Sequence, residues 1–280
     1  MIRSWLYVPA IAPRFVAKAA ERGADAIILD LEDSVAEAEK DAARAALADA
    51  VPIVRKGGAT IMVRVNSEPE RHRQDVEAAC RAGADGVLLA KTRDPAALRA
   101  LAEWLTPIEA SLGRPALRFV PVLEDPAAVL DARPIAMATP RNLALITGGE
   151  DLATAMGAEP SPELLRLPKQ MVNLAAKSAG LLSVGLMRSV ANFQDVEGIT
   201  ASATEARALG FDGATCIHPN VVPVLNAAFS PGEAELDAAR RMIAVYEEQA
   251  ARGVGAFTFE GKMVDLPIVE RARRLLARVR

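Results

Sequence analysis

Three groups of acidic residues each follow an apolar run of the kind that forms a buried β-strand. The groups are residues 30–33 (Asp-Leu-Glu-Asp), Glu124-Asp125 and Glu150-Asp151. Parallel strands buried on both faces end where their apolar runs end, so we expect these acids to gather at one edge of a sheet or barrel. Carboxylate oxygens are the ligands that Mg²⁺ prefers in proteins. The pattern therefore predicts a magnesium enzyme.

The acids are not equivalent. Glu124 and Asp151 follow the fifth and sixth predicted strands, which are neighbours on a barrel rim, so we expect them to share one Mg²⁺. Alternatively, the acids of these two groups cap helices and stabilise helix dipoles, and Asp125 and Glu150 fit that role better than their partners. We expect the acids of residues 30–33 to point in different directions, one toward metal-bound water and another toward a neighbouring Lys or Arg.

Two basic residues also stand near strand ends. Arg64 lies in the apolar run 61–66, where its planar fork could hold a substrate carboxylate or carbonyl and oppose developing negative charge. An ion pair with the first acidic group is a second, compatible role. Lys91 follows the run 86–90 and keeps a Schiff-base aldolase open as a rival mechanism. Neighbouring acids would raise its pKa, however, so we interpret Lys91 as an ion-pair partner.

Histidine, cysteine and motif content argue against several other enzyme classes. His72 lies in a charged stretch that predicts a solvated helix start, and His218 closes the eighth strand, where it can satisfy backbone groups. Cys80 and Cys216 lack the paired spacing of a zinc cluster or disulfide scaffold and are expected to be buried, reduced thiols. No Gly-x-Ser-x-Gly, Walker A or Gly-x-Gly-x-x-Gly sequence is present.

Composition sets the broad class. The chain has 280 residues, of which 51% are hydrophobic, so it can bury a large core as one barrel or two smaller domains. Its net charge of −3 does not favour nucleic acid as a partner. No apolar run approaches the roughly 20 residues needed to span a bilayer, and the N-terminus lacks the apolar region of a signal peptide. We expect a cytoplasmic protein with no membrane partner.

The order of the predicted elements favours a TIM barrel. Short apolar runs alternate with helical stretches, and the predicted strands cover residues 4–8, 26–30, 60–65, 86–90, 117–123, 143–147, 182–186 and 214–217. Eight strands, each followed by a helix, fit an α/β fold of the (β/α)₈ type over residues 1–228. Residues 229–280 predict a C-terminal helical extension or lid that is not an independent domain. It would contain a helix over 233–252, an ordered connection over 253–265 and a last helix to residue 280.

Several short motifs, taken in order, resemble one known family. They are Arg3-Ser4-Trp5-Leu6-Tyr7-Val8-Pro9, Asp30-Leu31-Glu32-Asp33-Ser34-Val35, Val63-Arg64-Val65-Asn66, Gly149-Glu150-Asp151-Leu152, Ile217-His218-Pro219 and Gly261-Lys262-Met263-Val264-Asp265. Each motif is weak alone, but together they span almost the whole chain. The sequence is similar to the β-subunit of citrate lyase and its stand-alone relatives, within the aldolase and citrate lyase group of TIM barrels.

The resemblance implies a Mg²⁺-dependent carbon-carbon lyase, or its reverse condensation, acting on a 3-hydroxyacyl-CoA thioester such as malyl-CoA, citramalyl-CoA or citryl-CoA. It implies that Glu124 and Asp151 hold the metal and that Arg64 binds substrate. The acids Glu32 and Asp33 would support metal-bound water and nearby basic groups.

The same resemblance assigns roles to residues outside the acidic groups. Arg14 and Lys18 match contacts to the coenzyme A phosphates, although by themselves they are ordinary exposed helix positions. The chemistry also makes Gly149 and Glu150 candidates for binding the carboxylate of a keto acid through backbone N–H groups. Asp265 matches an aspartate that moves a proton in the active site of a neighbouring subunit, which implies a homo-oligomer such as a trimer. Alternatively, Asp265 caps the final helix.

Two other functions remain open at this point. The chain could be the β-subunit of a multi-subunit citrate lyase that acts on an acyl-carrier-protein thioester, or a non-catalytic barrel scaffold. Two departures from the family pattern bear on substrate choice. Asp125 stands where a threonine is usual, and residues 186–189 (Leu-Met-Arg-Ser) replace an acidic and aromatic stretch.

Overall fold

Eight parallel strands form a nearly closed barrel in the computed structural model, which describes residues 1–277. The strands are β1 (Ser4–Pro9), β2 (Ala26–Asp30), β3 (Thr60–Val65), β4 (Gly86–Leu89), β5 (Arg118–Leu123), β6 (Ala144–Thr147), β7 (Leu182–Val184) and β8 (Ala214–Cys216). Neighbours in sequence are neighbours in the sheet, and β8 pairs with β1. A parallel bridge between Val184 and Gly213 joins β7 to β8. The predicted (β/α)₈ fold is confirmed.

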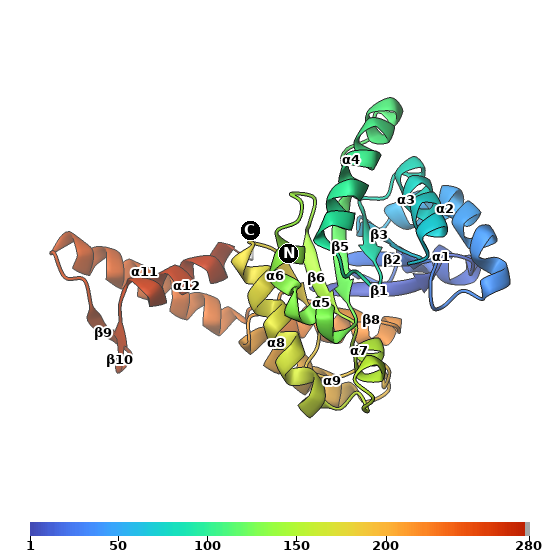
Figure 1. Ribbon diagram of the computed structural model, residues 1–280. Coiled ribbons are helices and arrows are strands. Elements are labelled where there is room, and N and C mark those ends of the chain that lie inside the picture. The colour runs from blue at the N-terminus through green and yellow to red at the C-terminus, as the bar shows by residue number, and fades with distance from the viewer. Residues whose placement is uncertain (278–280) are drawn as a thin grey trace. The chain divides into compact units, whose positions relative to one another are not determined.

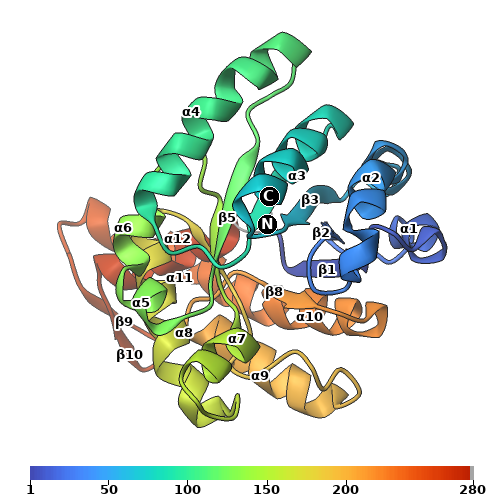
Figure 2. The same cartoon turned by 45° about the vertical axis from the view of Figure 1, so that its right-hand side comes forward.

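Helices cover the outside of the barrel (Figures 1 and 2). They are α1 (Pro13–Ala19), α2 (Lys40–Arg55), α3 (Pro69–Ala82), α4 (Pro95–Leu112), α5 (Pro126–Leu130), α6 (Ala132–Ala136), α7 (Gly149–Ala155), α8 (Pro162–Ser178), α9 (Val196–Ala208) and α10 (Val222–Phe229), with short 3₁₀ turns at Glu37–Glu39 and Pro219–Val221. Capping residues explain several boundaries. The side chains of Asp94, Asp125 and Ser161 accept backbone N–H groups at the starts of α4, α5 and α8, each just before a proline.

Side chains alternate between the inside and the outside of the barrel, as the period of a β-strand requires. One apolar cluster fills the barrel and includes Trp5, Ala26, Ile28, Met62, Leu88, Val120, Val122, Ala144, Ile146 and Val184. A second, larger cluster lies between the strands and the helices and includes Ile27, Leu29, Ile61, Val63, Phe119 and Leu123. Two residues after the inward-facing Trp5, Ile28, Met62 and Val122, the same face of the strands carries Tyr7, Asp30, Arg64 and Glu124. The strand period therefore brings polar groups from four strands to one end of the barrel.

The chain divides into two compact units, Ile2–Phe229 and Ser230–Arg280, the latter grouped with Met1. The second unit consists of α11 (Glu233–Ala251), the hairpin β9 (Phe257–Phe259) and β10 (Lys262–Val264), and α12 (Leu266–Ala277). The expected ordered connection is this hairpin. Its turn residues Glu260 and Gly261 both have positive φ, at 47° and 77°, as a tight two-residue turn requires. The predicted end of the last helix, residues 278–280, lies outside the described residues, and the dependence of this unit on the barrel stays a prediction.

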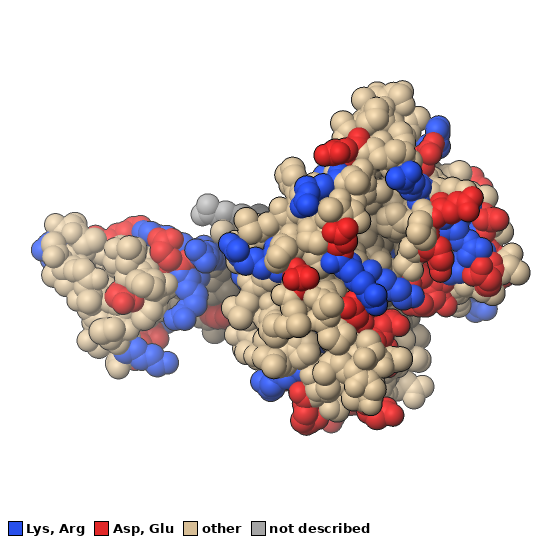
Figure 3. All heavy atoms as spheres, viewed as in Figure 1, with Lys and Arg blue, Asp and Glu red and all other residues tan. Residues whose placement is uncertain are grey.

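Acidic and basic side chains are interspersed on the face shown in Figure 3, and a group of basic side chains gathers near the N-terminal end of α4. Within residues 1–277, no helix combines the length and the apolar character that crossing a bilayer requires.

Candidate active site

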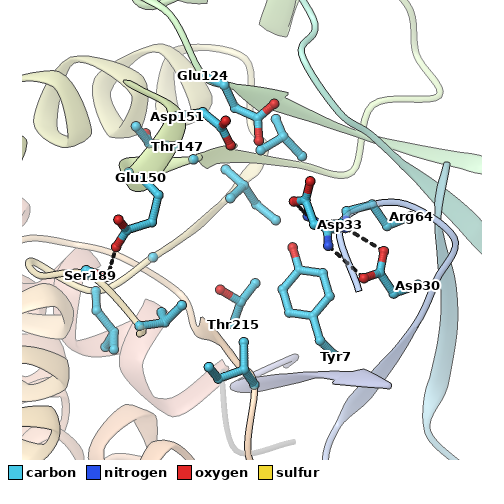
Figure 4. A pocket seen from close by; sticks show the side chains of 18 of the residues that line it. Tyr7, Asp30, Asp33, Arg64, Glu124, Thr147, Glu150, Asp151, Ser189 and Thr215 are labelled. Atoms are coloured by element: carbon cyan, nitrogen blue, oxygen red, sulfur yellow. Dashed lines mark hydrogen bonds and ion pairs between the residues drawn. The ribbon is translucent and has the colours of Figure 1, made fainter. Parts of the chain in front are cut away.

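A cavity of about 470 Å³ opens at the carboxyl end of the barrel strands. Its walls come from seven of the eight strands or the loops that follow them. The polar lining includes Tyr7, Asp30, Asp33, Ser34, Arg64, Glu124, Thr147, Glu150, Asp151, Lys169, Arg188, Ser189 and Thr215. All three acidic groups of the sequence contribute, as Figure 4 shows for the labelled residues. The expected gathering of acids at one rim is confirmed.

Arg64 holds the first acidic group together. Its Nε and Nη2 donate to the two carboxylate oxygens of Asp30, each at 2.7 Å. Its Nη1 donates to Asp33 at 2.7 Å and lies 3.1 Å from Glu32 Oε2. The expectation that these acids point in different directions is therefore wrong. All three reach one guanidinium, and the ion-pair role of Arg64 is confirmed.

The turn after β2 explains this convergence. The backbone N–H of Glu32 donates to Asp30 Oδ1 at 3.0 Å, and Ser34 donates to Asp30 Oδ2 through its backbone N–H at 3.2 Å and its hydroxyl at 2.5 Å. The buried Lys40 ammonium donates to the carbonyls of Leu31 at 3.2 Å and Glu32 at 2.8 Å. A tight turn around the Asp30 carboxylate folds the later acids back toward the strand that carries Arg64.

Charges in this group largely compensate one another. Burial alone would raise the pKa of Asp30, but hydrogen bonds and charge from Arg64 outweigh it and lower that pKa. Burial raises the pKa of Glu32 despite Arg64. Glu32 Oε1 lies 3.3 Å from Lys91 Nζ, which confirms the ion-pair interpretation of Lys91. Burial would lower the pKa of Lys91, but the Glu32 charge outweighs it and raises that pKa, which disfavours a Schiff base.

The negative charge of Glu124 is compensated much less. Its side chain is buried, with 7% of the residue exposed, and Oε2 accepts the backbone N–H of Lys91 at 2.7 Å. Burial, followed by the negative charges of Glu32 and Asp151, raises the pKa of Glu124 to about 7. Gly148 leaves the space that this side chain occupies, since a Cβ there would lie 2.4 Å from Glu124 Cγ. A carboxylate so placed favours a bound cation.

Asp151 and Glu150 lie in the first turn of α7, and both line the cavity. Glu150 accepts a hydrogen bond from the hydroxyl of Ser189, whereas Asp151 lies on the side of Glu124 (Figure 4). Asp125 caps α5, accepting the N–H groups of Ala127 and Ala128 at 3.0 and 3.1 Å. The capping role of Asp125 is thus confirmed.

Glu124 and Asp151 fit a magnesium site better than a site for a metal that needs a full set of protein ligands. Within residues 1–277, no three His, Cys, Asp or Glu side chains are grouped to hold a metal. Mg²⁺ commonly keeps several waters and binds through one or two carboxylates. Glu32 Oε2 is buried and accepts no hydrogen bond from the described residues, so it offers an acceptor for such a water.

Sequence reasoning missed several polar residues that line the cavity, among them Tyr7 and Lys169. Tyr7 lies beneath Arg64, whose guanidinium carbon is 4.8 Å from the ring centre, and burial raises the pKa of the Tyr7 hydroxyl. Lys169, only 4% exposed, donates to the carbonyls of Leu186 at 2.7 Å and Arg188 at 2.9 Å, and burial lowers its pKa to about 8. Strand period predicts the position of Tyr7, and helical spacing on the buried face of α8 predicts that of Lys169.

The remaining candidates have different settings. Arg14 and Lys18 are exposed on α1, and neither forms an ion pair with another residue of the described chain. Gly149 lines the cavity at the start of α7, but the neighbouring Gly148 N–H donates to the Leu123 carbonyl at 3.0 Å. Asp265 belongs to the C-terminal unit, where its carbonyl accepts N–H groups from the first turn of α12.

No histidine or cysteine lines the cavity that holds the acids, within the part of the chain that the structure describes. His218 caps the turn at Pro219 by accepting the Asn220 N–H at 3.2 Å. The expected solvated helix start at His72 is wrong in part, because this ring is half-buried within α3 and its Nδ1 lies 3.0 Å from the Asn66 carbonyl. Cys80 and Cys216 are buried free thiols.

Comparison with known proteins identifies the family. Residues 3–219 match the HpcH/HpaI aldolase/citrate lyase family. The chain belongs to this family. It is 37% identical over 279 residues to a (3S)-malyl-CoA thioesterase of Cereibacter sphaeroides, covering 99% of this chain and 94% of the relative. It is 34% identical over 281 residues to the citrate lyase subunit beta of Escherichia coli strain K12, covering 99% and 92%.

A solved structure of this family carries a relevant set of ligands. The CitE protein of Mycobacterium tuberculosis, in complex with magnesium, acetoacetate and coenzyme A, matches with a TM-score of 0.78 and 33% identity, covering 99% of this chain and 97% of that chain. RipC from Yersinia pestis matches with a TM-score of 0.69 and 27% identity, covering 84% and 98%. The fold and the family therefore agree.

Proposed function

We propose that this protein is a Mg²⁺-dependent carbon-carbon lyase that cleaves or forms a 3-hydroxyacyl-CoA thioester of the malyl, citramalyl or citryl type. The observation that carries the proposal is the placement of the buried, poorly compensated Glu124 beside Asp151 in a cavity that also contains Arg64 (Figure 4). Family membership supports the reaction class, and the magnesium, acetoacetate and coenzyme A of the CitE complex support the ligands.

Glu124 and Asp151 would hold the metal in this proposal, with water and substrate completing its shell. When bound, Mg²⁺ supplies Lewis-acid polarisation of a substrate oxygen. The first-turn N–H groups of α7 at Gly149 and Glu150 lack intrahelical acceptors and would receive a substrate carboxylate. The Glu150 side chain is engaged by Ser189, so its contribution to substrate binding would come from its backbone.

Arg64 would oppose the negative charge that develops on the thioester enolate. Two of its donors hold Asp30, and a third holds Asp33, so its guanidinium is oriented before substrate arrives. Glu32 would orient a water molecule at the metal, and Asp33 would keep Arg64 in place. These assignments give each residue of the first acidic group a distinct function despite their shared partner.

Three further assignments complete the proposal. Arg14 and Lys18 would bind the coenzyme A phosphates, since both are exposed cations without an ion-pair partner in the described chain. Asp265 would transfer a proton at the acetyl methyl group in the site of a neighbouring subunit. The protein would then be a homo-oligomer such as a trimer, acting in the cytoplasm on a small thioester.

Hydrolysis of the thioester is the second candidate, and it is favoured by the 37% identity to a malyl-CoA thioesterase. The two reactions release different products. Carbon-carbon cleavage leaves acetyl-CoA and a 2-oxo acid, whereas hydrolysis leaves free coenzyme A and a hydroxy acid. A third possibility, the β-subunit of a citrate lyase complex, is supported by the 34% identity to that subunit and requires an acyl-carrier-protein thioester.

The test incubates the purified full chain with Mg²⁺ and malyl, citramalyl and citryl thioesters, each on coenzyme A and on acyl-carrier protein. Acetyl thioester, 2-oxo acid and free thiol are measured separately. We expect acetyl-CoA and a 2-oxo acid from at least one coenzyme A substrate, abolished by chelation and by Asp151→Ala. Free thiol with no acetyl thioester would favour the thioesterase, and no reaction in either direction with any substrate would support a non-catalytic barrel.

A further inference from the structure

A second cavity, of about 480 Å³, lies outside the barrel mouth between α3, α4 and the loop after β4. It is as large as the candidate active site, and no residue lines both cavities. Its lining residues are Ser67, Pro69, His72, Arg73, Leu89, Ala90, Lys91, Thr92, Arg93, Asp94, Ala97, Leu98, Ala100 and Leu101. None of the functions proposed above uses this space.

The lining of this second cavity combines cations with an apolar floor. Three basic side chains, those of Arg73, Lys91 and Arg93, and one acidic side chain line it. The single acid, Asp94, is engaged as the cap of α4, where it accepts the Ala96 N–H at 2.7 Å. Apolar side chains of β4 and α4 form most of the remaining lining.

Two guanidinium groups in this cavity retain free donors. The guanidinium carbon of Arg73 lies over the ring of Trp104, 5.6 Å from the ring centre. Arg73 has no carboxylate partner within residues 1–277. Arg93 uses Nε to donate to Asp125 Oδ2 at 2.6 Å, while its two Nη groups have no acceptor in the described chain. Lys91 differs, because its ammonium is already paired with Glu32.

We infer that this second cavity binds a small aliphatic dicarboxylate at a site separate from the reaction centre. Arg73 comes from α3 and Arg93 from the loop before α4, so the two forks approach the cavity from different elements. Each fork can receive one carboxylate bidentately. The methylene chain between two carboxylates would cover the apolar floor, and the carboxylates would occupy the free donors of Arg73 and Arg93.

Titration calorimetry with glutarate tests this site on the full chain after a chelating resin has removed metal ions, because EDTA, itself a polycarboxylate, would compete for the arginines. Without a metal, the acids Glu124 and Asp151 stay uncompensated, and the active-site cavity therefore repels a dianion. We expect one site per chain with a dissociation constant on the order of millimolar or tighter. Valerate, which has the same carbon chain and one carboxylate, should bind about tenfold more weakly because one charge-assisted contact is lost.

Matched variants separate this cavity from the rest of the protein. Ala97→Trp places a large side chain into the cavity from an exposed position on α4 and should abolish glutarate binding. Arg73→Ala should weaken glutarate about tenfold, whereas Arg99→Ala, which removes an exposed arginine of α4 outside the lining, should leave it unchanged.

Three results would overturn the inference: no glutarate binding by the wild type, binding that survives both Ala97→Trp and Arg73→Ala, or valerate binding as tightly as glutarate. Because no thioester and no metal take part in these measurements, their outcome is independent of the lyase assay.

Discussion

The acids on the two sides of the active-site cavity differ in how far the protein compensates their negative charge. On the side of β2 and β3, Asp30 and Asp33 share the guanidinium of Arg64, and Glu32 lies between Arg64 and Lys91. On the side of β5 and β6, Glu124 is buried near other negative charges, and burial and those charges raise its pKa to about 7. The same residue type is therefore charge-compensated by the protein on one side and left in need of a cation on the other.

This difference predicts different effects of substitutions on the two sides. Breaking a buried ion pair leaves an uncompensated charge, so removing one partner on the β2–β3 side should be strongly destabilising. The β5–β6 side carries repulsion that the fold tolerates, as expected of a binding site that a cation completes. Each of the following variants tests one side against the other.

The largest expected effect is on activity at the β5–β6 side. Asp151→Ala should lower kcat/KM about a thousandfold, because the metal would lose one of its two carboxylates. The measurement is acetyl-CoA release in saturating Mg²⁺. Glu159→Ala, which removes an exposed acid that does not line the cavity, serves as the control and should change the rate less than about twofold. An Asp151→Ala enzyme with near wild-type activity would exclude this residue from the metal site.

The largest expected effect on stability is at the β2–β3 side. Arg64→Met should lower the free energy of unfolding by about 3–5 kcal/mol, because it leaves the buried Asp30 without its cation and Glu32 with Lys91 alone. Urea unfolding measures the change. Adding Asp30→Asn to the same chain should restore part of the loss, since one uncompensated charge is removed. A change below about 1 kcal/mol would mean that Arg64 is not needed to compensate these acids.

Glu124 and Asp30, one from each side, should respond to pH with opposite signs. Folding raises the pKa of Glu124 from about 4.5 to about 7, so the folded state holds a proton that the unfolded state releases. In EDTA this contribution is full below about pH 4.5 and is lost as pH rises to about 7, up to about 3 kcal/mol. The lowered pKa of Asp30 acts in reverse, and its contribution is lost as pH falls below the usual range of a carboxyl.

The unfolding free energies of wild type and Glu124→Gln, measured from pH 4 to pH 8 in EDTA, isolate this contribution. We expect the difference between them to change in the direction described, because glutamine does not titrate. Parallel pH profiles would show that Glu124 ionises at its ordinary pKa in the folded protein.

The smallest expected effect concerns the residue beside Glu124. Asp125→Thr restores the usual family residue and retains a side chain that can cap α5, so it should cost less than about 1 kcal/mol in stability. Its ion pair with the exposed Arg93 should contribute little. We expect Mg²⁺ affinity to change less than about twofold, measured by calorimetry. A loss comparable to that of Asp151→Ala would place Asp125 in the metal site.

Much of the architecture was predictable from local patterns. Apolar runs separated by helical stretches identified all eight barrel strands, because buried parallel strands leave a continuous hydrophobic signal. Capping at Asp125 was also predictable, since aspartate before proline at a helix start has a local physical cause. The hairpin at Phe257–Val264 was missed as a strand pair, because its strands have three residues each and carry little periodic signal.

The gathering of the three acidic groups around one cavity was predictable, and the contacts among their side chains were less so. The sequence by itself determined that acids follow three strands and that Arg64 lies near another strand end, because period and element order depend on neighbouring residues. Only the tertiary structure decided that Asp30, Glu32 and Asp33 converge on Arg64, that Glu124 lies buried against Gly148, and that Lys169 enters the cavity wall. These contacts join residues far apart in the chain, and their energies depend on burial and on distances that spacing along a sequence does not contain.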